Sequence, residues 1–338
     1  MIDDFTLIII THNNQKYLPR IMSYYFDASF KVIIADSSKS KFETNIKSNF
    51  NYTYLPFTTL IEKLAIVLKK VNTKFVAITG VDDFITRNGI AQSLQFLREN
   101  NDYSSAKGNC YYFRKDSVHK KIKYFTIYSA WHEYKIDSIN PLQRIERHFN
   151  PYCTLFSSCH LTENLRIVFN VAKGKITNLF LNEYLTGLYP IAHGKHAEFS
   201  FLYQLRESAK MSDGNTTPNL DELVLNNNYE FEQFINIHST LISSITRRDV
   251  SDCALRLKNI LVQYSEVLRK QKLRKADTFK QKIELIISKT PFIGKPTLDF
   301  FFERKMENII KKRITNNIDK IELNNIENHL KKYAQYTT

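Results

Sequence analysis

The feature that most constrains the fold is a largely apolar run at residues 74–79, which ends close to two adjacent carboxylates, Asp82 and Asp83. Strands buried on both faces have such continuous runs, so the run predicts a central strand of an α/β sheet. Ligands of open α/β sheets bind beyond the carboxyl ends of the strands, where we expect both aspartates to face solvent. A divalent cation would relieve the repulsion between them and still offer coordination sites to phosphate oxygens. The pair is a candidate metal–diphosphate site, and the alternative is a turn or a helix cap.

Strands and helices alternate before this run. Apolar segments predict strands at 5–10, 31–35 and 51–56. One intervening helix begins near Pro19, because proline is tolerated in a first helical turn, and another begins after Thr59, which forms a capping box with Glu62. Asn88 is the expected cap of the next helix. This alternation predicts a mostly parallel nucleotide-binding half, and neither GxGxxG nor GxxxxGK[ST] occurs, which disfavours a dinucleotide fold and a P-loop.

The pattern changes after residue 104. Aromatic segments at 111–113 and 124–128 resemble strands, as does 153–160, and helices are expected at 141–149 and 176–189. A loop rich in Asn, Gly, Pro and Thr then precedes a helical tail. We therefore divide the chain into a first domain, 1–212, and a basic helical C-terminal region, 219–338.

The net charge of +14 is concentrated in the C-terminal third of the chain. From Arg247 onward there are 21 Lys and Arg against 11 Asp and Glu, with five positive side chains close together at Arg269, Lys270, Lys272, Arg274 and Lys275. Such an excess favours an anionic partner, such as a phospholipid surface or an acidic glycan; nucleic acid is the least favoured, because no nucleic-acid-binding motif is recognisable. The alternative is a solvated set of helices.

Cysteine spacing and the N-terminal sequence favour a cytoplasmic protein. The four cysteines form no CxxC pair, and the first residues lack the basic region of a signal peptide. No apolar run approaches the roughly 20 residues that a membrane span needs. Any contact with the inner membrane is therefore expected to be peripheral.

The N-terminal part of the chain resembles the GT-A fold glycosyltransferases, in particular the large inverting family 2 and a bacterial subgroup within it. The matching stretches are IIITHN at 8–13, IIADSS at 33–38 and the segment 71–85; Asn182-Glu183, Gly194-Lys195 and Arg206-Glu207 follow in the order of the subgroup. The resemblance covers about residues 1–207. It implies an α/β class with a GT-A type, mostly parallel nucleotide-binding sheet flanked by helices, followed by an α-helical C-terminal region.

The resemblance also implies a set of residues for the nucleotide-sugar donor. Thr11 and Asn13 would line the nucleotide pocket, and Asp36 would accept a hydrogen bond from the nucleobase. Lys63 and Asp82 complete the expected donor-binding set.

One departure from the family pattern concerns the metal. The family motif is Asp-x-Asp, whereas this chain has Val81-Asp82-Asp83-Phe84, so the first carboxylate is missing. By resemblance Asp83 aligns with the aspartate that coordinates Mn²⁺ or Mg²⁺. His193 or His196 could supply a further ligand, since imidazole suits such ions, and the alternative is an ordinary surface or core histidine.

The implied reaction is a direct displacement at the anomeric carbon. Negative charge builds on the departing nucleoside diphosphate, which a metal would neutralise, and a carboxylate must take the proton of the acceptor hydroxyl. Glu183 is the expected base, with Glu133 and Glu198 as substitutes; a solvated helix glutamate is the alternative reading of Glu183.

The sequence thus predicts a metal-dependent inverting glycosyltransferase. It would move a sugar from a nucleotide-sugar to a hydroxyl of a glycan or lipid-linked acceptor, in bacterial surface polysaccharide synthesis. The alternative function is an inactive GT-A-like module that holds an anionic polymer or a membrane surface.

Overall fold

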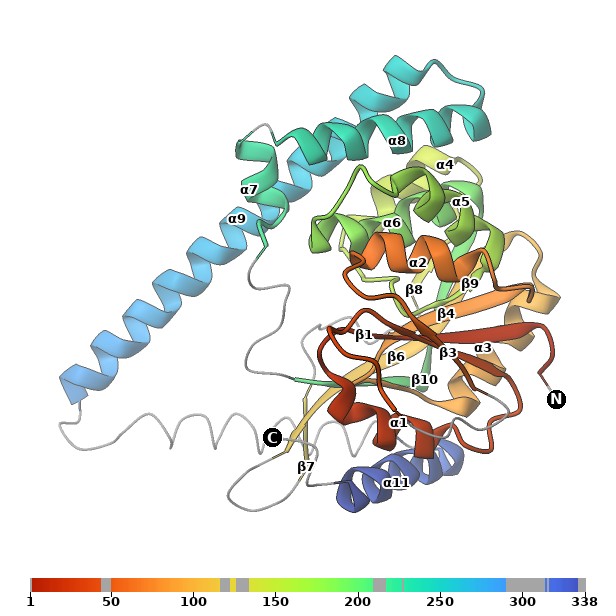
Figure 1. The fold of residues 1–338 in the computed structure, drawn as a ribbon. Coiled ribbons are helices and arrows are strands. Elements are labelled where there is room, and N and C mark those ends of the chain that lie inside the picture. Colours follow the sequence, from red (N-terminus) through yellow and green to blue (C-terminus); the bar gives the residue numbers. More distant parts are fainter. Residues whose placement is uncertain are drawn as a thin grey trace.

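The computed structural model describes residues 2–43, 50–115, 122–125, 134–208, 217–226, 228–289, 314 and 316–333. Within these residues a sheet of ten strands lies between helices on both of its faces (Figure 1). The strands are β1 (Phe5–Thr11), β2 (Lys31–Asp36), β3 (Phe50–Tyr54), β4 (Phe75–Gly80), β5 (Phe84–Ile85), β6 (Tyr103–Lys115), β7 (Ile122–Phe125), β8 (Tyr134–Ile136), β9 (Cys159–Leu161) and β10 (Lys195–Glu207). The helices are η1 (Gln15–Tyr17), α1 (Leu18–Tyr24), α2 (Leu60–Leu68), α3 (Arg87–Glu99), α4 (Pro141–His148), α5 (Thr162–Ala172), α6 (Leu179–His193), α7 (Leu220–Leu225), α8 (Tyr229–Thr246), α9 (Val250–Lys289) and α11 (Asn317–Lys332).

The strand order is β3-β2-β1-β4-β9-β6-β10-β5, with β7 beside β6 and β8 beside β10. β1 is parallel to β2 and β4, β2 is parallel to β3, and β6 is parallel to β10. Because β9 is antiparallel to both β4 and β6, these two strands run in the same direction. The carboxyl ends of β1, β2, β4 and β10 therefore lie along one edge of the sheet. The predicted class, a mostly parallel α/β sheet flanked by helices, is confirmed.

The two faces of the sheet bury separate hydrophobic cores. Successive side chains of a strand point to opposite faces, so Ile8 of β1 belongs to the core shared with α2, α5 and α6, and Leu7 to the core shared with α1 and α3. In β4, Val76 likewise belongs to the core with α2, α5 and α6, and Ala77 belongs to the core with α1 and α3. This two-sided burial is the physical reason that the central strands are largely apolar.

Local signals near the helix starts are partly confirmed. Thr59 and Glu62 form the predicted capping box: the Thr59 N–H donates to the Glu62 carboxylate (2.9 Å) and the Glu62 N–H donates to the Thr59 hydroxyl (3.3 Å). The predicted cap at Asn88 is wrong. Thr86 caps α3 instead, because its backbone is still extended after β5 and its hydroxyl accepts the Gly89 N–H at 3.0 Å.

The expected strand at 153–160 is mostly a turn. The Ser158 N–H donates to the Leu155 carbonyl at 3.0 Å, and only β9 at the end of the segment joins the sheet. The expected helix at 176–189 begins later, at Leu179, because the Asn178 side chain accepts the N–H groups of the first helical turn. The expected strand at 124–128 is described only as far as Phe125.

The helices after residue 219 contribute to both cores. α8 and the first part of α9 pack on the α4–α6 side, and α9 then extends away from the body of the molecule (Figure 1). α11 lies on the opposite face, against α1 and α3. Its Glu322 accepts the Tyr24 hydroxyl at 2.9 Å and the Asn88 N–H at 3.1 Å. None of the helices in the described part of the chain combines the length and the apolar character that crossing a bilayer requires.

Candidate active site

The polar groups of the candidate site gather along the carboxyl edge of the parallel strands. Thr11 ends β1, Asp36 ends β2, the Asp82–Asp83 turn follows β4, and Arg206 lies at the end of β10. Residues far apart in the sequence meet here because parallel strands place all their carboxyl ends together. Thr11, Asn13, Asp36, Lys63, Asp82 and Asp83 lie at or beneath this edge, whereas His193, His196 and Glu198 do not.

Asp36 is the centre of a hydrogen-bond network. One carboxylate oxygen accepts from the Gln15 amide (2.6 Å) and the Tyr52 hydroxyl (2.5 Å), and the other accepts from the Ser38 N–H (2.8 Å). Burial alone would raise the pKa of Asp36, but the hydrogen bonds from Ser38, Tyr52 and Gln15 outweigh it and hold the pKa below its usual value. The carboxylate has no exposed surface. It therefore orients Gln15 and Tyr52, which are partly exposed.

The loops after β1 and β2 are tied together above this network. The Asn13 N–H donates to the Ser38 hydroxyl at 2.8 Å, and the Asn13 side chain accepts from the Lys39 N–H at 3.2 Å. His12 Nδ1 lies 3.1 Å from the Ser37 carbonyl oxygen. Asn13 has a φ of +53°, a left-handed conformation in which Asn is enriched. The two loops form one fixed rim with the side chains of His12 and Asn13 exposed.

Lys63 supports this rim from below. Its ammonium donates to the Thr11 carbonyl at 2.8 Å and to the Ser37 hydroxyl at 2.9 Å, and only 2% of the residue is exposed. Burial lowers the pKa of Lys63 to about 8, and the Asp36 carboxylate opposes that shift. The sequence predicts Lys63 as a donor-binding residue; in the structure it joins the ends of β1 and β2 beneath the pocket.

Asp83 is buried, so the expectation that both aspartates face solvent is wrong for this residue. One of its oxygens accepts from Arg206 Nε (3.1 Å) and more distantly from the Gln204 amide (3.5 Å), and the other accepts from the Glu207 N–H (3.0 Å). Burial, together with the neighbouring Asp82, raises the pKa of Asp83 to about 7 against the opposing effect of Arg206. The Asp82 residue is partly exposed.

An ion pair that sequence reasoning missed holds the Asp82–Asp83 turn from behind. Arg20 of α1 donates to the Glu207 carboxylate at 2.7 Å and to the Asp82 carbonyl at 2.8 Å. Its guanidinium has no exposed surface and lies over the Tyr17 ring, 4.7 Å from the centroid. A single arginine in a short helix gives no signal in the sequence, because its partners are 62 and 187 residues away.

Glu183, the predicted base, lies near the start of α6 and is partly exposed. The Tyr152 hydroxyl donates to its carboxylate at 2.6 Å. Burial alone would lower the pKa of Arg206, but it is raised, chiefly by the Asp83 carboxylate and with a smaller contribution from Glu183. Glu183 is therefore near enough to the Arg206 guanidinium to contribute to its raised pKa.

Aromatic rings fix Tyr152, the residue that donates to Glu183. Its ring lies 5.3 Å from Tyr184 and 5.4 Å from Tyr264, measured between ring centroids. Tyr264 belongs to α9, so the C-terminal helices contact the side chain that orients the predicted base.

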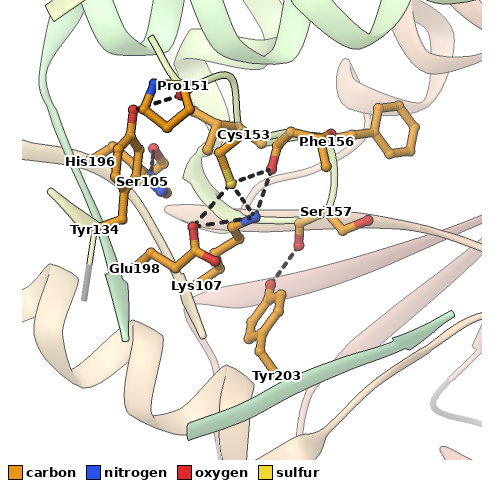
Figure 2. Close-up of polar contacts among 12 residues, drawn as sticks. Ser105, Lys107, Tyr134, Pro151, Cys153, Phe156, Ser157, His196, Glu198 and Tyr203 are labelled. Atoms are coloured by element: carbon orange, nitrogen blue, oxygen red, sulfur yellow. Dashed lines mark hydrogen bonds and ion pairs between the residues drawn. The ribbon is translucent and has the colours of Figure 1, made fainter. Parts of the chain in front are cut away.

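The substitute base Glu198 lies inside the molecule, in the polar cluster of Figure 2. It accepts from the Cys153 thiol at 3.1 Å and lies 3.7 Å from the Lys107 ammonium. Lys107 also donates to the Thr154 carbonyl at 2.7 Å. Glu198 thus balances a buried positive charge, as buried ions require a partner. The other substitute, Glu133, lies outside the described residues.

The two histidines considered as metal ligands do not reach Asp83. His193 ends α6 just before β10 begins, whereas Asp83 meets the last residue of β10; thirteen strand residues span roughly 40 Å. His193 lines a cavity of about 470 Å³ at the opposite, amino edge of the sheet, beside Lys74. His196 is buried and pairs with the Ser105 hydroxyl at 2.8 Å (Figure 2), and burial lowers its pKa well below the usual value.

The donor set at the Asp82–Asp83 turn does not fit the divalent metal that the sequence predicts. Both Asp83 oxygens accept hydrogen bonds from the protein, and one of those donors is a cationic guanidinium. Within the described ranges, no three His, Cys, Asp or Glu side chains lie together so that they could hold a metal ion. The positive charge next to Asp83 comes from Arg206.

No protein-family model and no curated protein matches the chain. Among solved structures it is similar to S. aureus TarS, with a TM-score of 0.46 and 13% identity over 76% of this chain and 43% of that chain. A TarS 1-349 structure in complex with UDP-GlcNAc gives a TM-score of 0.49 and 15% identity over 76% of this chain and 71% of that one. The complex of TarS 1-349 with UDP gives 0.39 and 15%, over 79% and 92%. The chain thus spans less than half of the first of these TarS chains.

Proposed function

We propose that this protein is an inverting glycosyltransferase that uses a nucleotide-sugar donor. The observation that carries the proposal is the order of groups along the carboxyl edge of the sheet. The tied loops above Asp36 lie at one end, the Asp82–Asp83 turn with Arg206 in the middle, and Glu183 on the Arg206 side. In this proposal the loops above Asp36 bind the nucleobase and ribose, and Arg206 beside the Asp82–Asp83 turn binds the diphosphate. The acceptor hydroxyl lies at Glu183.

The proposed reaction is a single displacement. Glu183 takes the proton of the acceptor hydroxyl as the acceptor oxygen forms its bond to the anomeric carbon. The bond from that carbon to the diphosphate oxygen breaks on the opposite face, and the nucleoside diphosphate leaves with the bonding electrons. One displacement assisted by one base inverts the anomeric configuration. The hydrogen bond from Tyr152 would hold the Glu183 carboxylate in one orientation.

The acceptor side of the proposal rests on the exposed basic residues of α9. Arg269 and Lys270 are exposed, whereas Lys272 is paired with Asp221 at 2.9 Å. We propose a glycan or lipid-linked acceptor of a bacterial surface polysaccharide, made at an anionic membrane surface that these residues approach. Each basic residue near such a surface contributes about 1 kcal/mol.

Binding and turnover measured in parallel test the proposal. UDP and UDP-GlcNAc, the ligands in the similar TarS structures, are the first probes in a thermal-shift assay, because a ligand of the native state raises its stability by mass action. UDP release from UDP-GlcNAc and other sugar nucleotides is then compared between wild type, Glu183→Gln and the control Glu146→Gln, an exposed glutamate of α4. We expect a loss of two or more orders of magnitude in Glu183→Gln only, roughly the contribution of a general base. Binding without turnover of any donor would favour the inactive binding module.

A further inference from the structure

We propose that Arg206, and not a divalent cation, supplies the positive charge that neutralises the diphosphate of the departing nucleotide. This inference rests on the proposed function and names the residue that contacts the leaving group. In it, Asp83 has a different task from the one the sequence predicts: it holds Arg206 in place.

The Arg206 guanidinium is fixed on one side and open on the other. Its Nε donates to Asp83 at 3.1 Å and one terminal nitrogen donates to the Tyr112 hydroxyl at 3.3 Å. The guanidinium carbon lies 5.4 Å from the centroid of the Tyr112 ring. Its side chain is nevertheless 38% exposed, at the edge of the sheet where the strands end. A guanidinium has five N–H groups, and the remaining ones have no hydrogen bond to another residue in the described part of the chain.

The groups around Asp83 hold its carboxylate against Arg206. Its side chain is only 9% exposed, and its second oxygen accepts the Glu207 N–H at 3.0 Å. A metal ion bound to Asp83 would have to displace the guanidinium or lie beside it, and two cations repel each other. The position where the family has its first aspartate is Val81, which is 3% exposed and packs in the core shared with α1 and α3.

The chemistry of the leaving group suits a guanidinium. An arginine presents a planar fork of N–H groups that matches two phosphate oxygens, and such charge-assisted bonds are roughly twice as strong as neutral ones. A donor that is already oriented stabilises developing charge without reorganisation during the reaction. The Asp83, Tyr112 and Glu207 contacts provide that orientation before any nucleotide binds.

Calorimetric titration of the full chain with UDP tests this inference. Wild-type protein is titrated in EDTA and again with Mg²⁺ or Mn²⁺. We expect the dissociation constants for UDP with and without metal to agree within about twofold. A change of that size is smaller than the loss of one charged hydrogen bond would cause. This experiment depends on no variant.

Variants of Arg206 then identify the group responsible. In EDTA we expect Arg206→Gln to weaken UDP binding by about tenfold or more, as for the loss of one charged hydrogen bond, and Arg206→Lys to fall between it and wild type. The control Arg256→Gln, an exposed arginine of α9, should bind as wild type does. Thermal unfolding of each variant shows whether it is folded.

Three results would overturn the inference in distinguishable ways. UDP binding that requires Mg²⁺ or Mn²⁺ would overturn the role of Arg206 and leave the proposed function standing. If wild type binds neither UDP nor any other nucleoside diphosphate under these conditions, both are overturned. Unchanged UDP affinity in folded Arg206→Gln would also exclude the proposed contact.

Discussion

Replacing Asp83 with asparagine should change how the stability of the protein depends on pH. The pKa of Asp83 is raised from 3.8 to about 7 in the folded protein, so the folded state binds its proton more tightly than the unfolded state does. A raised folded pKa contributes stability that is fully present below the unfolded pKa and is lost as pH rises through the folded pKa. The window for this effect therefore lies between about pH 4 and pH 7.

The magnitude follows from the size of the shift. Each pKa unit corresponds to about 1.4 kcal/mol. The pKa of Asp83 is raised by about three units, so about 4 kcal/mol of folding stability is lost between pH 4 and pH 7. Asparagine keeps an oxygen for the Glu207 N–H and cannot titrate. The free energy of unfolding of wild type relative to Asp83→Asn should therefore fall by about 2–4 kcal/mol from pH 4 to pH 7.

Urea unfolding followed by circular dichroism at half-unit pH intervals measures this difference. The control is Asp3→Asn, at an exposed aspartate before β1, because the charge of Asp82 contributes to the raised pKa of Asp83 and must stay in place. The difference in unfolding free energy between wild type and Asp83→Asn could instead stay constant within about 0.5 kcal/mol across the pH window. That result would show that Asp83 is not buried in this way in solution.

Three further predictions concern the surroundings of the site. Tyr152→Phe removes the hydroxyl that donates to Glu183, so kcat in steady-state assays should fall by about tenfold, as for the loss of one charged hydrogen bond. Glu322→Gln weakens the attachment of α11, so the melting temperature should fall and limited proteolysis should cleave near α11 first. Reversing Arg269 and Lys270 to glutamate should abolish cosedimentation with anionic liposomes while donor hydrolysis is unchanged, because both are exposed on α9.

Each of these predictions has a contrary result, and the first two have a matched control variant. Tyr229→Phe, at an exposed tyrosine, should leave kcat unchanged, and an unchanged kcat in Tyr152→Phe would contradict the positioning role of Tyr152. Glu99→Gln, at the end of α3, should leave proteolysis unchanged, and equal cleavage of Glu322→Gln and wild type would contradict the attachment. Equal sedimentation of the reversed variant and wild type, or none by either, would leave these α9 residues as an ordinary solvated surface.

The sheet was predictable because its signals are local. A strand buried on both faces is largely apolar, and the β4 segment shows this without reference to the rest of the chain. The Thr59 capping box is equally local, since both of its hydrogen bonds join residues three apart. Asn88 misled the cap prediction because the two-residue strand β5 extends the backbone up to Thr86, which no periodicity indicates.

The chemistry of the site was less predictable because its partners are distant in sequence. The burial of Asp83 depends on Arg206, which lies 123 residues away and reaches it only through the pairing of β10 with β5. Tyr152 reaches Glu183 across 31 residues. The hydrogen bond between Tyr24 and Glu322 spans 298 residues, so the sequence of the C-terminal helices alone could not show that one of them packs against α1.

The most direct test of the account is proton NMR of the sugar released from an α-linked nucleotide-sugar, with water as the acceptor. If Glu183 activates the acceptor for a single displacement, the first product of the wild-type protein is the β-anomer. In Glu183→Gln its rate of appearance then falls by two or more orders of magnitude, roughly a general base's contribution, while UDP affinity is unchanged. Initial release of the α-anomer, or an unchanged rate in Glu183→Gln, would contradict this mechanism.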